Sequence, residues 1–160
     1  LQQMWNISYT FVDALAISAQ TLVAEYVAKN KNFIKSNLRK CFINLTFSIS
    51  IILSIIFYFG IEFLSEFVSN QSFIQLNDKK LVFVFCLTIF FGYFAFLWDG
   101  ILLGLDKSKE FSYITIFGSI SGFVALFALL NNEESLLNIW VALILSLIVR
   151  ASFGYYYENK

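Results

Sequence analysis

The chain has 160 residues, 59% of them hydrophobic, and its mean hydropathy is +0.73. Eleven basic and eleven acidic residues balance each other, so the composition gives no electrostatic case for a nucleic-acid partner. Histidine is absent and the two cysteines lack metal-binding spacing, so we expect no metal and no cofactor. The composition instead indicates an all-α integral membrane protein, whose first partner is the lipid bilayer in which it is embedded.

Five apolar segments are each long enough to cross a bilayer as a helix, since a crossing takes roughly 20 mostly apolar residues. They cover residues 5–28, 38–60, 81–104, 112–130 and 136–156. Cys41 and Cys86 lie inside the second and third segments, and we expect both to be small buried side chains.

The first segment carries a polar stripe. At helical spacing, Asn6, Thr10, Asp13 and Gln20 fall on one face, and Asp13 stands close to the middle of the segment. Polar side chains inside a membrane should face the bundle interior or a hydrated cavity, so we interpret the four as candidates for a cation and substrate cavity. An equally good interpretation is that they form hydrogen bonds between packed helices.

The third segment ends with Asp99 and with Gly100 and Gly104, which stand four residues apart. A carboxylate in an apolar segment is costly unless it faces protein, water or a cation, so Asp99 is a candidate functional residue. The two glycines offer a groove where another helix backbone could approach closely.

The fourth and fifth segments add two further features. Gly118 and Gly122 predict close packing of the fourth helix, for the same reason as the first glycine pair. Arg150 lies in the fifth segment at a depth similar to that of Asp99. The two charges are therefore expected to pair, either as a structural ion pair or as a group that takes part in coupling.

Two of these segments resemble known transporter helices. The stretch with Asp99, Gly100, Gly104, Lys107 and Lys109 resembles the tenth helix of the DinF-like branch of the MATE (multidrug and toxin extrusion) family.

The first segment is similar to the eighth helix of the same branch. The matching residues are Asp13, Ala14, Ala16, Leu22 and Val23. The segment also departs from the family pattern, because Gln20 stands where an acid is usual and Ala24 and Ala28 replace two usual glycines.

The resemblance implies helices 8–12 of a twelve-helix fold. Residues 1–160 would then be part of the C-terminal lobe, with the seventh helix and the N-terminal lobe outside the sequence. It further implies a multidrug antiporter of the plasma (inner) membrane that exports small hydrophobic or cationic compounds by alternating access. H⁺ or Na⁺ would be the coupling ion, and the missing N-terminal lobe would be the partner of this chain.

The basic residues predict the orientation. If the loops alternate between the two sides, Lys79 and Lys80 lie on one side and nine lysines and arginines on the other. The positive-inside rule places the nine in the cytoplasm, with residue 1 outside and residue 160 inside.

Two other functions fit the same pattern. One is a lipid-linked oligosaccharide flippase of the same superfamily, whose cavity would need more basic side chains than Arg150 alone. The other is a membrane scaffold subunit that only assembles. An enzyme is not expected, because the chain has no histidine, no Gly-x-Ser-x-Gly and no paired ligand set.

Overall fold

The computed structural model describes residues 2–29, 36–69, 79–129 and 135–160. They form five α-helices, each with a stretch long and apolar enough to cross a membrane. The helices are α1 (Gln2–Ala28), α2 (Asn37–Ser69), α3 (Lys79–Gly104), α4 (Ser108–Leu129) and α5 (Ser135–Glu158). The predicted all-α membrane fold is confirmed.

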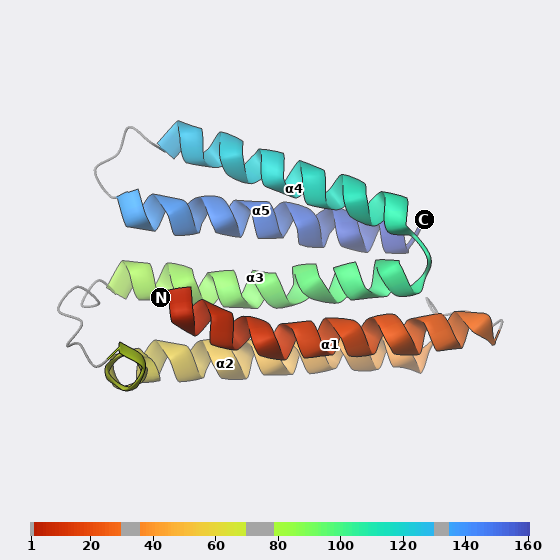
Figure 1. Ribbon diagram of the computed structural model, residues 1–160, viewed down its shortest axis with the longest axis horizontal. Helices are drawn as coiled ribbons and strands as arrows, with labels where there is room; N and C mark the ends of the chain where they lie inside the picture. Colours follow the sequence, from red (N-terminus) through yellow and green to blue (C-terminus); the bar gives the residue numbers. More distant parts are fainter. Residues whose placement is uncertain (1, 30–35, 70–78, 130–134) are drawn as a thin grey trace.

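Successive helices run in opposite directions along the bundle (Figure 1). The C-terminal ends of α1, α3 and α5 therefore lie at the same end as the N-terminal ends of α2 and α4. We call this the basic end, because it carries Lys29, Arg39, Lys40, Lys107 and Lys109. The start of α3, with Lys79 and Lys80, lies at the opposite end.

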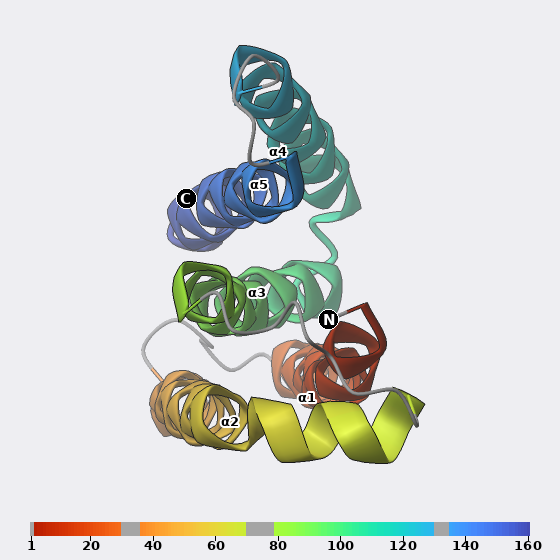
Figure 2. The ribbon, with the colours of Figure 1, turned by 90° about the vertical axis from the view of Figure 1, so that its left-hand side faces the viewer.

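Helix α3 is the centre of the bundle. It packs against α1 and α2 on one side and against α5 on the other (Figure 2). Of its membrane-spanning window, 61% is buried, whereas no other helix exceeds 28%. The distribution of apolar residues around the helix does not by itself explain this position, because α4 is equally uniform around its circumference and is far less buried.

Helix α4 stands at the edge. It packs mainly along α5, and Ile114 and Gly118 are its buried residues (Figure 2). Its other large apolar side chains, such as Phe123 and Phe127, are exposed. In a membrane these side chains would contact lipid or another part of the protein.

The start of α4 differs from the sequence prediction. Helix α4 begins at Ser108 rather than residue 112, because the α3–α4 turn is tighter than predicted. Asp106 adopts a positive φ of 60°, and the Lys107 N–H donates to the Leu102 carbonyl at 2.9 Å, which closes α3 and lets α4 start at once. Helix α2 continues to Ser69, past the end of its membrane-spanning stretch at Ile61.

Candidate functional site

The polar stripe of α1 faces away from the helices that pack against it. Asn6, Thr10, Asp13 and Gln20 are all exposed. The buried face lies on nearly the opposite side of the helix and consists of Met4, Ser8, Val12, Leu15, Ala19 and Val23. The structure therefore brings the four predicted residues together on one face, but it does not pack them against another described helix.

No hydrogen bond between helices accounts for this stripe within the described residues. The Thr10 hydroxyl donates to the Asn6 carbonyl of its own helix at 3.1 Å. The ion pairs found in the described segments join Glu25 with Lys29, Arg39 with Glu158, and Asp99 with Arg150, so none involves Asp13. The arrangement disfavours the interpretation as hydrogen-bonded packing inside this bundle.

The glycine pair of α3 sets the rotation of α1. A Cβ atom on Gly104 would lie 2.6 Å from the Gln20 carbonyl oxygen and 2.8 Å from the Val23 Cβ. A Cβ atom on Gly100 would collide with the backbone of Ala16 in the same way. The backbones of α1 and α3 can meet only because these side chains are absent, and this contact turns the polar stripe away from α3.

The second glycine pair lies against α5. A Cβ atom on Gly122 would lie 3.1 Å from the Ser146 Cβ, and one on Gly118 would collide with the Arg150 side chain. Gly118 thus provides the space in which the aliphatic part of Arg150 crosses α4.

Asp99 and Arg150 form an ion pair between α3 and α5. One guanidinium nitrogen of Arg150 donates to Asp99 Oδ2, and the guanidinium also lies over the Phe96 ring at 5.2 Å. Asp99 is buried, with 7% of its surface exposed. The buried Arg150 Nε has no partner among the described residues, so the pair leaves one donor unused.

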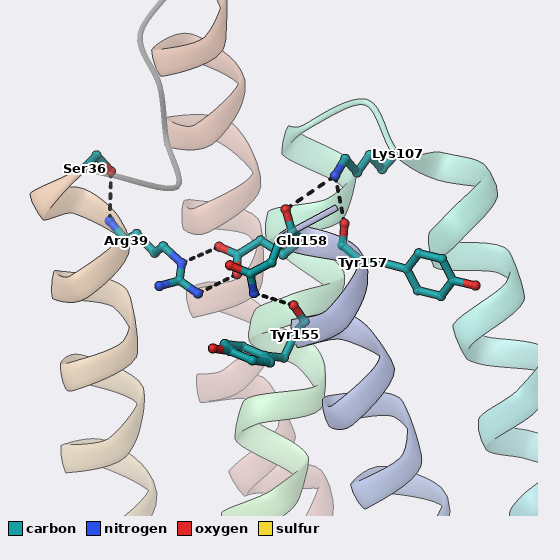
Figure 3. A network of polar contacts seen from close by, with 7 residues as sticks. Ser36, Arg39, Lys107, Tyr155, Tyr157 and Glu158 are labelled. Atoms are coloured by element: carbon teal, nitrogen blue, oxygen red, sulfur yellow. Dashed lines mark hydrogen bonds and ion pairs between the residues drawn. The ribbon is translucent and has the colours of Figure 1, made fainter.

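A second buried ion pair joins α2 to α5 at the basic end (Figure 3). Arg39 binds Glu158 through two hydrogen bonds, from Nε to Oε1 at 2.7 Å and from Nη2 to Oε2 at 2.8 Å. Arg39 also lies over the rings of Trp98 and Tyr155, at 5.9 and 5.8 Å. Paired hydrogen bonds of this kind are among the strongest that a carboxylate accepts.

Lys107 extends this network from the α3–α4 turn. Its Nζ donates to the Tyr157 carbonyl at 2.8 Å and lies 3.4 Å from the Glu158 carbonyl (Figure 3). These are among the last carbonyls of α5, which have no partner inside the helix, and a cation is the favoured group there. Ser36 accepts a hydrogen bond from the Arg39 N–H at 3.2 Å and so caps the start of α2.

The pairing of Arg39 with Glu158 was not predicted from the sequence. Arg39 is one of the nine lysines and arginines assigned to the cytoplasmic side, and Glu158 had no predicted role. A usable signal was present, since alternating helices bring the start of α2 and the end of α5 to the same side of the membrane. Depth matching, which suggested the pairing of Asp99 with Arg150, would have suggested this pair as well.

The expectation for the cysteines was wrong for Cys41. Cys86 is buried, but Cys41 is exposed because it lies on a side of α2 that faces away from α3. Within the described segments, no group of three or more His, Cys, Asp or Glu side chains is placed to hold a metal ion.

Comparison with known proteins places this sequence in a family. The family model named MatE matches residues 1–128, from α1 to the last residues of α4. The chain belongs to the MatE family. Searches of curated proteins and of solved structures found no match. MatE proteins are membrane transporters of the efflux and flippase superfamily, so the five apolar helices belong to a multi-pass transporter.

Proposed function

We propose that this MatE chain forms part of a cation-coupled antiporter, with the polar stripe of α1 lining the transport cavity. The position of Asp13 is the observation that best supports the proposal. It lies within a membrane-spanning stretch, it is exposed on the bundle, and no described cation neutralises it. A carboxylate cannot face lipid at that depth without a large cost, so it needs a hydrated cavity.

The chemistry of antiport follows from this position. A carboxylate in a cavity holds a proton or Na⁺ in one state and a cationic substrate in another, and this difference in affinity drives exchange. Asn6, Thr10 and Gln20 provide neutral polar groups on the same face. The substrates are small hydrophobic or cationic compounds, and the coupling ion is H⁺ or Na⁺.

The whole transporter contains a second lobe that faces α1 across the cavity. In this proposal the chain is helices 8–12 of a DinF-like protein in the plasma membrane, with the basic end in the cytoplasm. The oligosaccharide-flippase alternative is less well supported. Its cavity would need cationic groups for phosphate, and Arg150 is already paired with Asp99.

Replacing Asp13 by Asn in the full-length transporter tests the proposal. Asn keeps the size and most hydrogen bonds of the side chain but cannot titrate or bind a cation by charge. We expect membrane expression close to the wild type and loss of efflux driven by a pH or Na⁺ gradient in proteoliposomes.

The double variant Asp99→Asn, Arg150→Gln is the matched control, because it removes the charges of the buried pair together. Coupled efflux should survive in this variant if the pair is structural. Unchanged coupled efflux in Asp13→Asn would reject the role proposed for Asp13. Loss of coupling only in the double variant would assign that role to Asp99.

A further inference from the structure

A groove on the outer surface of α2 and α3 has no role in the proposed transport site. It has a volume of about 380 Å³. The side chains along it include Ile51, Ile55, Tyr58, Phe83, Leu87 and Phe90. It lies on other helices than the polar stripe of α1, so the transport proposal does not account for it.

The walls of this groove suit hydrocarbon. Its two small polar side chains are already bonded to each other's backbone. The Ser54 hydroxyl donates to the Cys86 carbonyl at 3.1 Å, and the Cys86 thiol donates to the Ser54 carbonyl at 3.3 Å. A polar ligand would lose its hydrogen bonds to water here without replacing them, whereas an apolar chain would lose none.

The groove lies at membrane depth in both helices, since the candidate membrane-spanning stretches run from Asn37 to Ile61 in α2 and from Lys79 to Gly104 in α3. Because the helices are antiparallel, Ile51 and Phe90 lie at its deep end, and Tyr58 and Phe83 lie towards the end of the bundle opposite the basic end. At this depth the surrounding solvent is the acyl chains of the bilayer.

A positive charge marks the outer end of the groove. Lys79 is exposed and lies one turn before Phe83, on the face of α3 that continues through Leu87 and Phe90. The tyrosine at this end, Tyr58, is the residue type enriched where a membrane meets water. Lys79 stands at the end of the bundle where basic residues are few, and a lipid phosphate gives this exception a physical reason.

We propose that this groove binds one acyl chain of a membrane phospholipid, whose phosphate lies beside Lys79. The hydrophobic walls hold the chain, and the lysine favours an anionic headgroup. The site is independent of the transport cavity, because it uses none of the residues of the α1 stripe.

Tryptophan fluorescence of the full-length protein in vesicles tests this site. The reporter Phe83→Trp lies in the groove, and Phe127→Trp on the exposed face of α4 is the control. The native Trp5, Trp98 and Trp140 also fluoresce, so the quenching of the parent protein is subtracted from that of each variant. The vesicles contain phosphatidylcholine with a small fraction of phosphatidylglycerol whose acyl chains are brominated to quench fluorescence. We expect the brominated phosphatidylglycerol to quench Phe83→Trp more than its fraction in the lipid mixture predicts. It should quench Phe127→Trp in proportion to that fraction.

The role of the Lys79 charge at the outer end of the groove is tested in the same assay. Lys79→Gln should reduce the preference for phosphatidylglycerol about fivefold, the equivalent of one lysine near a membrane surface, whereas Lys109→Gln at the basic end should leave it unchanged. If Phe83→Trp does not fold, Phe59→Trp on the rim replaces it, because Phe59 is 80% exposed.

Two results would overturn the proposal. Equal quenching at the groove and control positions would show that the groove holds no selected lipid. Absence of quenching at the groove position would show that another protein segment covers it.

Discussion

Glu158 is the most deeply buried charged side chain among the described residues. Its side chain has no exposed surface, although a carboxylate is among the least common buried groups. The two hydrogen bonds from Arg39 replace the water that Glu158 loses. A buried pair of this kind contributes little relative to an apolar pair of the same size, but either partner alone is costly.

Arg39→Met is therefore expected to lower the free energy of unfolding by about 3 kcal/mol, because it leaves Glu158 buried without a counter-charge. Methionine preserves part of the packing over Trp98 and Tyr155. The melting temperature of the purified protein in detergent measures the effect. The double variant Arg39→Met, Glu158→Leu should recover most of the loss, and the absence of recovery would show that packing, not charge, is responsible.

The exposed pair of Lys29 and Glu25 provides the control for this prediction. Both side chains are more than half exposed, at 58% and 57%. Water and salt screen such a pair, so Lys29→Met should leave the melting temperature close to that of the wild type.

At the scale of the helices, the contact between α1 and α3 determines which face of α1 is presented. Backbone atoms of Ala16 and Gln20 occupy the space where side chains would stand on Gly100 and Gly104. Helix α3 also carries Gly92, whose added Cβ would lie 3.0 Å from the far end of the Trp5 ring and in ordinary contact with the Leu147 side chain at 3.7 Å. The three glycines therefore differ in how easily their surroundings can move.

Gly104→Ala is expected to destabilise the bundle by about 1–3 kcal/mol, because the added methyl group can be accommodated only by moving α1. Gly92→Ala should cost less, since the Trp5 ring can rotate aside. Melting temperatures of the two variants give the comparison. A larger loss for Gly92→Ala would mean that the α1–α3 backbone contact is not what holds α1 in place.

At the scale of the whole molecule, charge separates the two ends of the bundle. The basic end collects the starts of α2 and α4 and the ends of the other three helices, whereas Lys79 and Lys80 stand at the opposite end. The positive-inside rule therefore predicts that the basic end faces the cytoplasm.

Single cysteines in whole cells test this orientation, in a background with Cys41→Ala and Cys86→Ala. Lys79→Cys should react with a membrane-impermeant maleimide added outside, whereas Lys109→Cys should react only after the cells are opened. The reverse pattern would invert the topology, and with it the leaflet assigned to the groove between α2 and α3.

Local properties of the chain were enough to predict the helices. Apolar length decides whether a segment crosses the bilayer, so five helices followed from composition, with a boundary error at the α3–α4 turn. Helical spacing placed Asn6, Thr10, Asp13 and Gln20 on one face, because that face depends on the geometry of one helix alone. Depth along the helix brought Asp99 and Arg150 to the same level.

Contacts between distant segments could not be predicted in this way. Spacing shows that α1 has a polar face but not that this face is exposed, because exposure depends on which side of α1 meets Gly100 and Gly104. The burial of Glu158 and the exposure of Cys41 likewise depend on how α2 and α5 stand around α3. The physical reason is that the bilayer selects each helix separately by its length and apolarity, whereas the rotation and neighbours of a helix depend on close packing between side chains far apart in the chain.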